Sequence, residues 1–335
     1  MPKISNYIWS LKYTSIYMLL SILLFLFFSF KLDTKKELAF EFLNQNSVEI
    51  VVHEVLGADS SLIGYKSKVK TPVCEGKICY DVELIFYWNL LGDFVNYERI
   101  PGKPLTKRKH EAFTAADYQK LSELLSEKEP SFSNLKKDEL VVKLDAVSGA
   151  TLASIKGQTI EGAVYSCYTL WQIANGEVVA RIQRHTLQNM DRRIVRNIMS
   201  INSSEADYFL LNNFKKSDFL NFSSEIQVLI KRSKGYFAKN AIEKIPDVLF
   251  SNLEIQTFFS EQYPLLNYFA QTALLERLQK RTISNQLASK LFRSLTGDQY
   301  QNKLILQLLT FNLDNLSDPT IRESIGKITN ITDNK

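Results

Sequence analysis

The sequence predicts a chain of three parts: a single transmembrane helix, a mixed α+β domain and an all-α region of repeat-like helices. An uncharged apolar run near the amino terminus predicts the first part. Alternating apolar and polar residues between positions 65 and 89 predict paired strands in the second part. Apolar residues at helical spacing after position 200 predict the third part. We therefore expect boundaries at residues 1–32, 33–200 and 201–335.

The composition is that of a folded protein. Of the 335 residues, 45% are hydrophobic and 23% are charged, which excludes a disordered or fibrous chain. Three cysteines are too few for a disulfide-dense scaffold or a four-cysteine zinc module. The net charge is +5, and without Lys3, Lys12 and Lys31, which flank the apolar run, it is +2. This excess is too small for a typical nucleic-acid binder, so we expect no nucleic-acid partner. Cys74 and Cys79 have no nearby His or third Cys, so we expect no metal site either.

The apolar run covers residues 13–30 and contains no charge. As a helix it would be about 27 Å long, close to the thickness of the hydrocarbon layer. The alternative is a cleaved signal peptide, but no small-x-small cleavage site follows the run. We therefore predict an uncleaved signal anchor in contact with the lipid bilayer. Lysines on both sides of the run leave its orientation open.

The first elements after the anchor are expected to be a short helix at residues 38–44 and a strand at 47–55. Residues 65–73 and 80–89 then predict a β-hairpin, because apolar side chains recur at every second position of the latter segment. Cys74 and Cys79 flank the turn of this hairpin. Their Cα atoms would lie within disulfide range, and outside the cytoplasm we expect the pair to be oxidised.

The rest of the domain is expected to alternate between strands and helices. Residues 94–100 predict a third strand, and Thr114 with Asp117 forms a capping-box variant that opens a helix to residue 126. Residues 140–144 predict a short strand. Residues 155–175 predict a long helix that ends at Gly176, and residues 177–183 predict a final strand.

The pattern changes to a period of 3.6 residues from about position 203. Leu266, Ala270, Ala273, Leu274 and Leu278 show this spacing. Pairs of such helices would be about 30 to 40 residues long, the size of a helical-repeat unit. We expect an α-solenoid that resembles HEAT-type repeats, with an irregular helical bundle as the alternative.

The most informative segment runs from Asp145 to Ser154 and contains Ser148-Gly149-Ala150-Thr151. Ser-Gly-Ala-Thr arises by chance about once in 10⁵ positions. The strand at 140–144 would lead into a turn at Gly149, and residues 148–151 would begin the following helix. Free amides and the positive end of the helix dipole favour a phosphate there, beside the Thr151 hydroxyl. Asp145 would cap the turn or help a transferase to dock. The alternative is a helix N-cap without a ligand.

This segment resembles the flavinylation motif of the FMN-binding domain family. That family includes flavin subunits of sodium-pumping quinone reductases and related membrane electron-transfer complexes. The resemblance covers residues 145–154 as a motif and about 40–190 as a pattern of elements. It implies that a flavin transferase esterifies the FMN phosphate to Thr151, with a cofactor-binding site of Asp145, Ser148, Gly149, Ala150 and Ser154.

The predicted fold class is therefore an α+β FMN-binding-like domain, then an all-α, α-solenoid-like helical-repeat region, with one N-terminal transmembrane helix. Trp88, Tyr80, Phe113 and His110 are candidates to stack on the flavin ring. A continuous helix from Thr151 would carry Tyr165 about 21 Å away, which argues against Tyr165.

Together these expectations describe an electron-transfer flavoprotein or oxidoreductase component. It would lie in the cell inner membrane as a single-pass protein with its folded part extracytoplasmic, because the family's flavin transferase works there. It would pass electrons between a membrane donor and an outside acceptor, such as a redox protein or a quinone. The FMN would carry the redox chemistry, so no catalytic residue is assigned. The alternative is a membrane-anchored helical-repeat scaffold that binds protein without a cofactor.

Overall fold

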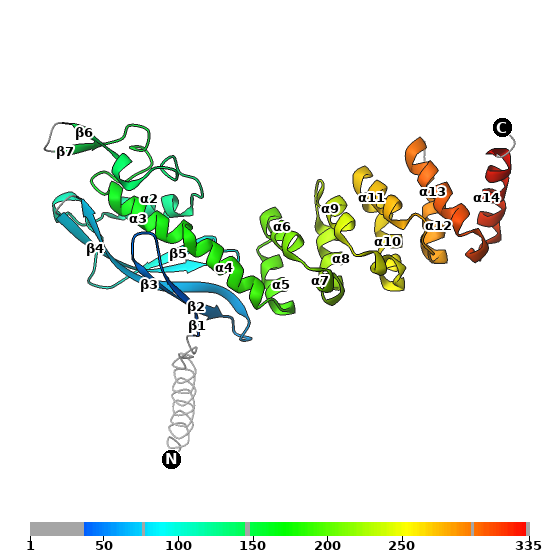
Figure 1. Cartoon of the computed structure of the whole chain (residues 1–335), viewed down its shortest axis with the longest axis horizontal. Coiled ribbons are helices and arrows are strands. Elements are labelled where there is room, and N and C mark those ends of the chain that lie inside the picture. The colour runs from blue at the N-terminus through cyan, green and yellow to red at the C-terminus, as the bar shows by residue number, and fades with distance from the viewer. Residues whose placement is uncertain (1–36, 76–77, 145–147, 296–297, 333–335) are drawn as a thin grey trace, which may run out of the picture.

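The computed structural model describes residues 37–75, 78–144, 148–295 and 298–332. The segment at residues 13–30, predicted to cross a membrane, lies outside these ranges. A sheet with covering helices forms one end of the molecule, and a succession of further helices extends away from it (Figure 1).

The sheet is a five-stranded antiparallel meander in which each strand pairs with the next one along the chain. The β3–β4 hairpin is its longest pair, with Tyr65 opposite Trp88 at one end and Cys74 opposite Cys79 near the other. The hairpin predicted from the period of two is confirmed. The strands are β1 (Leu38–Leu43), β2 (Glu49–Leu56), β3 (Leu62–Glu75), β4 (Ile78–Trp88) and β5 (Phe94–Arg99).

Residues 38–44, expected as a helix, form the edge strand β1 instead. Phe40 and Phe42 stand two positions apart, and their ring centroids are 6.2 Å from each other. Side chains two positions apart share one face of a strand but not of a helix. Pairing with β2 and burial of this face outweigh the helix propensity of Leu38 and Ala39.

Four helices follow the sheet, and the first three cover one of its faces (Figure 1). The Trp88 indole nitrogen donates to the Ala174 carbonyl at 2.7 Å, and the Tyr65 hydroxyl shares a hydrogen bond with the Thr186 hydroxyl at 2.9 Å. Because these groups are buried, the two bonds fix α3 and α4 across the sheet. The helices are α2 (Ala115–Ser126), α3 (Val164–Asn175), α4 (Glu177–Gln188) and α5 (Arg192–Ser200).

The segment at 177–183, expected as a strand, is the first half of α4. Val178, Ile182 and Thr186 recur every four residues, and all three are buried, as one face of a helix requires. Gly176 joins α3 to α4. A Cβ at this position would lie 2.4 Å from the Gln172 carbonyl oxygen, so only glycine permits the close approach.

The remaining helices form successive pairs. The first helices of the pairs begin at residues 204, 237, 268 and 299, at intervals of 31 to 33 residues. Hydrogen bonds across neighbouring pairs follow the same interval: the Arg277 guanidinium donates to the Ile245 carbonyl at 2.6 Å, and the Gln301 amide donates to the Tyr268 carbonyl at 3.1 Å. The helices are α6 (Ser204–Asn213), α7 (Lys216–Asn221), α8 (Ser223–Arg232), α9 (Phe237–Lys244), α10 (Leu253–Gln262), α11 (Tyr268–Leu278), α12 (Asn285–Arg293), α13 (Gln299–Phe311) and α14 (Pro319–Thr332).

Short elements complete the described chain. The β6–β7 hairpin lies at the end of the molecule opposite the helix pairs (Figure 1). Its strands are Val141–Leu144 and Ser148–Thr151. Single turns of 3-10 helix are η1 (Arg108–His110), η2 (Lys137–Glu139), η3 (Asp247–Ser251), η4 (Tyr263–Leu265) and η5 (Leu313–Asn315).

The predicted fold class is wrong. In place of an FMN-binding-like α+β domain, the structure has a five-stranded antiparallel sheet between Leu38 and Arg99, followed by helices. Among the residues that the structure describes, no helix combines the length and the apolar character needed to cross a bilayer. The predicted order of elements is wrong at two segments. Residues 38–44, expected as a helix, form a strand, and residues 177–183, expected as a strand, belong to a helix.

Candidate functional site

The strand β7 contains Ser148-Gly149-Ala150-Thr151, the central four residues of the sequence motif. It pairs antiparallel with β6, with Ser148 opposite Leu144 and Thr151 opposite Val141. Gly149 and Ala150 lie between these pairs. Asp145 falls outside the described residues. The predicted site residues from 148 to 151 therefore stand on a two-stranded hairpin.

The motif does not begin a helix, contrary to the prediction. The helix α3 starts only at Val164, because residues 152–163 form turns. Gly162 has a φ of 73°, in the left-handed region that a right-handed helix excludes. The amides and dipole of α3 are therefore separated from Thr151. The argument that placed Tyr165 about 21 Å along a continuous helix fails for the same reason.

Thr151 stands at the base of the hairpin. The next amide, of Leu152, donates to the Leu140 carbonyl at 3.0 Å, and Leu140 and Ile155 are fully buried on either side of this junction. The Thr151 side chain is partly exposed. A fixed backbone therefore presents a hydroxyl at the boundary between core and solvent.

The turn after Thr151 is held by neighbouring elements. The Ser131 amide donates to the Gln158 side-chain oxygen at 2.9 Å, and the Ser131 hydroxyl donates to the Ser154 carbonyl at 3.3 Å. The Lys120 ammonium on α2 donates to the Thr159 carbonyl at 2.7 Å. Ser154, the last predicted site residue, is exposed in this turn. The segment is thus attached to the rest of the domain on both sides of Ser154.

Two amides near Thr151 suit a phosphate. The amides of Ile155 and Lys156 donate to the Leu152 carbonyl at 3.1 and 3.2 Å, which turns the chain back on itself. The amides of Ala153 and Ser154 donate no hydrogen bond to a described residue. Successive backbone N–H groups in a turn can bind an anion by donating hydrogen bonds to it. The two residues after Leu152 therefore leave backbone donors of the kind that can bind a phosphate.

The predicted ring-stacking residues divide into two groups. Trp88 is 2% exposed and Phe113 is 7% exposed, so both belong to the core and cannot cover a bound ring. Tyr80 is also buried, but its ring contacts the exposed His110 ring with centroids 5.2 Å apart. His110 is the one residue of the four whose ring the described structure leaves at the surface.

The loop that carries His110 is joined to the segment before α3. The amide of Arg108 donates to the Gly162 carbonyl at 2.8 Å. Tyr165 follows on the first turn of α3, with the Lys137 ammonium 5.7 Å from its ring centroid. Sequence reasoning missed the pairing of Tyr165 with Lys137, because contact between residues so distant in sequence leaves no periodic signal.

The two cysteines of the β3–β4 hairpin are joined by a disulfide, as expected for an oxidising compartment. The third, Cys167 on α3, is fully buried and accepts a hydrogen bond from the Ile160 amide at 3.4 Å. Burial raises the pKa of the Cys167 thiol to about 11. Within the described parts of the chain, no group of three or more His, Cys, Asp or Glu residues is arranged to hold a metal ion.

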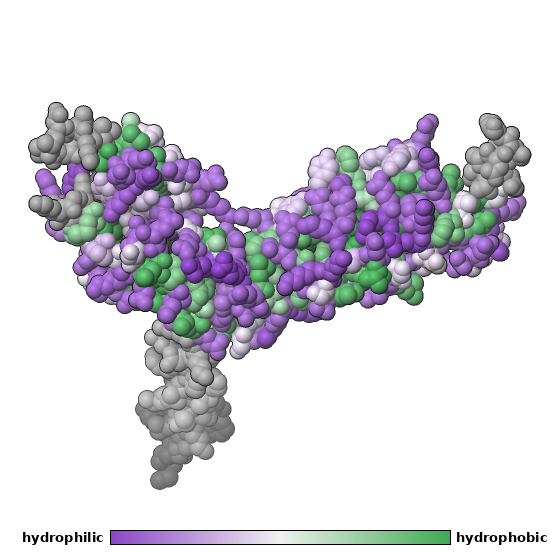
Figure 2. Space-filling model, viewed as in Figure 1, coloured by the Kyte–Doolittle hydropathy of each residue, from purple (hydrophilic) through white to green (hydrophobic). Residues whose placement is uncertain are grey.

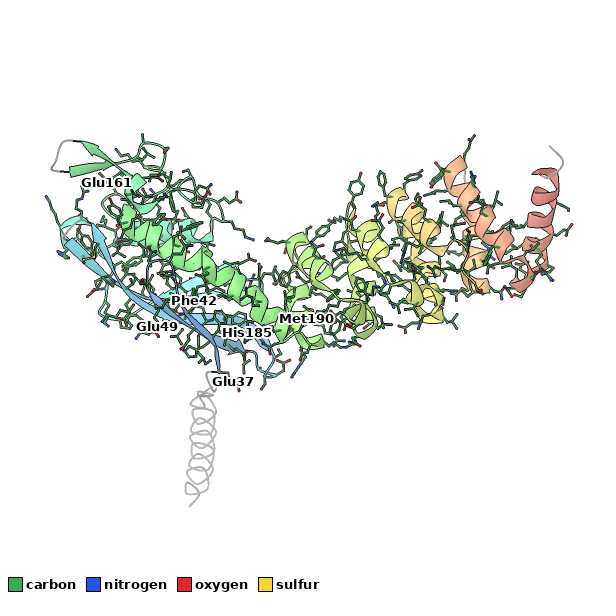
Figure 3. All side chains as sticks on the ribbon, viewed as in Figure 1. Glu37, Phe42, Glu49, Glu161, His185 and Met190 are labelled. Carbon is green, nitrogen blue, oxygen red and sulfur yellow. A yellow bond between two sulfur atoms is a disulfide. The ribbon has the colours of Figure 1, made fainter. Side chains whose placement is uncertain are left out.

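A cluster of titratable side chains lies away from the motif, where Figure 3 labels His185. The His185 Nδ1 atom is 3.1 Å from the Tyr65 hydroxyl, and its Nε2 atom is 3.7 Å from the Glu54 carboxylate. Burial raises the pKa of Glu54, against the opposing charge of His185. Burial also raises the pKa of Tyr65. This cluster joins α4 to the sheet and is remote from the motif.

Comparisons with protein-family models, with curated proteins and with solved structures give no match to this chain.

Proposed function

We propose that this protein is an electron-transfer flavoprotein that carries FMN covalently on Thr151. The observation that supports the proposal is the position of this threonine. Thr151, the last residue of Ser-Gly-Ala-Thr, ends the paired strand β7, and its side chain is partly exposed. The amides of Ala153 and Ser154, which follow shortly after, donate no hydrogen bond to a described residue.

The attachment would be a phosphodiester made by a flavin transferase. The Thr151 Oγ1 atom would attack the phosphorus on the FMN side of a flavin dinucleotide supplied as co-substrate. The pyrophosphate P–O bond would break, and the proton of the hydroxyl would leave with the released nucleoside monophosphate. The amides of Ala153 and Ser154 would donate to the phosphate oxygens. Bound FMN supplies one- and two-electron redox chemistry, and the chain positions it.

The ring would lie on the side of the domain that carries the β6–β7 hairpin. His110 would be one candidate to contact it, because His110 is exposed and its ring packs on Tyr80. Tyr165 presents a partly exposed ring from α3. An aromatic surface at this position would support one face of the isoalloxazine ring, since offset stacking between rings is favourable.

We further propose that the folded part lies outside the cytoplasm, attached to the inner membrane. The disulfide between Cys74 and Cys79 supports an oxidising compartment, because cytosolic thiols are kept reduced. The uncharged run at residues 13–30 supports membrane attachment. Electrons would then pass between a donor in the membrane and a redox protein or quinone outside.

Intact mass and in-gel fluorescence test the attachment. The full chain, produced with a flavin transferase and then denatured, should gain the mass of one FMN less one water and should fluoresce. Thr151→Ala should lose both signals, and Thr151→Ser should retain part of them because it keeps a hydroxyl. Thr282→Ala is the matched control, since it removes an exposed threonine hydroxyl between α11 and α12, away from the motif, and should leave the mass gain intact.

The outcomes separate the two candidate functions. Flavin that survives denaturation in Thr151→Ala would place the attachment on another residue. A wild-type chain that gains no mass would instead favour a protein-binding scaffold without a cofactor. The helix pairs, whose hydrophilic surface is interrupted by hydrophobic patches (Figure 2), are the feature that favours that alternative.

A further inference from the structure

A long groove runs along α13 at the carboxyl-terminal end of the helix pairs. It has a volume of about 1050 Å³. One face of α13 forms its length, and the end of α11 and one residue of α14 form its borders. The described residues that line it are Gln279, Lys280, Gln299, Asn302, Lys303, Leu306, Gln307, Thr310, Phe311 and Ile325.

The helix α13 carries apolar residues on two faces. Leu304, Ile305, Leu308 and Leu309 face the core and are buried. Leu306 and Phe311 lie on the groove side, and the Phe311 side chain is 55% exposed. Packing against neighbouring helices therefore does not account for Leu306 and Phe311, which lie among polar side chains of the groove. A large exposed aromatic residue in a groove with a polar rim is typical of a protein-binding site.

The charge of the groove is of one sign. Lys280 and Lys303 are the only charged residues among its described lining, and both are exposed. Neither ammonium lies within ion-pair distance of a described carboxylate. Two copies of this chain that met face to face through the groove would bring lysine against lysine, which is unfavourable. A partner with carboxylates would complement the groove.

We propose that this groove binds an amphipathic, acidic α-helix of a partner protein. The face of α13 between Gln299 and Phe311 is about 18 Å long, which suits a helix of about 13 residues. Apolar side chains at positions i, i+3 or i+4 and i+7 of the partner would pack along α13 and contact Leu306 and Phe311, whose side chains are accessible in the groove. Helix-in-groove recognition uses this arrangement. Carboxylates on the flanks of the partner helix would pair with Lys280 and Lys303.

The side-chain amides on the rim add hydrogen-bonding capacity. Gln299 and Gln307 project from α13, and Gln279 lies at the end of α11 beside Lys280. The Gln279 amide already donates to the Leu275 and Leu304 carbonyls, both at 3.0 Å, so it holds the border in place. This proposal is independent of the flavin, because the groove and the β6–β7 hairpin stand at opposite ends of the molecule (Figure 1).

A displayed library of 14-residue, helix-forming peptides tests the proposal. The peptides would share leucines at positions i, i+3 and i+7 and would carry Glu, Gln or Lys at the flanking positions. Selection on the full chain should enrich peptides with Glu. Phe311→Ser and the double variant Lys280→Glu/Lys303→Glu should each weaken binding of the enriched peptide by about tenfold or more.

Charge exchange and matched controls make the result specific. The peptide with Lys in place of Glu should bind the double variant better than it binds the wild-type chain. Leu265→Ser removes a 75% exposed leucine outside the groove, and Lys216→Glu reverses an exposed charge on α7. Both controls should bind the peptide as the wild type does, and circular dichroism should show every variant folded.

Three results would overturn the proposal. The first is enrichment of neutral or basic peptides, or of none. The second is binding that Phe311→Ser and the double variant leave unchanged. The third is concentration-dependent dimerisation of the wild-type chain that Phe311→Ser abolishes, which would assign the groove to a second copy.

Discussion

Glu225 places a buried carboxylate where α5 meets α8. Its oxygens accept hydrogen bonds from Arg192 and Arg196 at 3.0 Å each and from the Ser224 hydroxyl at 2.9 Å. Burial opposes ionisation, but the Ser224 hydrogen bond and the two arginines outweigh it, and the pKa of Glu225 lies below its ordinary value. A carboxyl whose pKa is lower in the folded state stabilises the fold at neutral pH.

The replacement Glu225→Gln should therefore lower the free energy of unfolding by about 1–3 kcal/mol at pH 7. The difference from wild type should be constant above about pH 5 and should shrink as the pH falls below about 4, through the unfolded and then the folded pKa. Thermal unfolding followed across this pH range measures it. Glu323→Gln is the control, because Glu323 forms an exposed pair with Lys327 and should cost less than about 0.5 kcal/mol. A pH-independent difference would contradict the role assigned to the charge.

Single residues also explain why the candidate site was predicted only in part. The identity of Thr151 as the candidate attachment residue came from the motif alone, and its partly exposed side chain is compatible with it. The helix expected at residues 155–175 begins only at Val164, after Gly162, which has a positive φ and lies against the 107–108 loop. Glycine is compatible with either conformation, so the sequence could not distinguish them.

At the scale of elements, the β3–β4 hairpin combines a long register with one covalent bridge near its turn. The disulfide joins Cys74 and Cys79, which pair directly across the strands. The loop it closes is short, so the bridge should add about 2 kcal/mol or less. Its effect should be local, because the strand pairs from Tyr65 to Val69 hold the other end of the hairpin.

Mild reduction should therefore raise hydrogen exchange at residues 71–73 and 80–82 and leave the pairs near Tyr65 protected. Alkylation of the reduced, folded chain should modify two cysteines. Cys167 should react only after unfolding, because it is fully buried and its raised pKa keeps the thiol protonated. Mass spectrometry counts the adducts. Three adducts on the folded chain would show that α3 opens readily.

Elements with a strong local signal were the ones that the sequence predicted correctly. The period of two at residues 80–89 identified β4, and the Thr114–Asp117 capping box identified the start of α2. By contrast, β1 and α4 have short apolar runs that fit either a strand or a helix. Their conformations depend on long-range contacts, such as Thr186 with Tyr65, which a local pattern does not contain.

At the scale of the whole molecule, α5 connects the sheet to the helix pairs. The Asn197 side-chain amide donates to the Leu62 carbonyl at 2.9 Å, and on its other side the Met199 carbonyl accepts from the Arg232 guanidinium at 2.9 Å. The boundary predicted near residue 200 therefore cuts the chain where one helix packs against both parts. Periodicity located the change of pattern at this point, but it could not show that α5 is shared.

A comparison of two truncated chains follows from this arrangement. Residues 33–201 lack α6 and α8, so the buried side chains Val195 and Ile198 would lose part of their cover and become an apolar seam. Residues 33–234 keep both helices and the Glu225 pairs with Arg192 and Arg196.

We expect both chains to take up FMN on Thr151, because the β6–β7 hairpin and the turn at 152–160 are anchored by Leu140, Ser131 and α2. The shorter chain should unfold several degrees lower, by about 4 °C or less for each kcal/mol lost, and should aggregate more. Calorimetry and intact mass on the two proteins measure these effects. If residues 33–234 fold but gain no FMN while residues 33–335 do, the helix pairs beyond residue 234 help to form the attachment site, and a flavin module confined to the sheet end of the molecule is excluded.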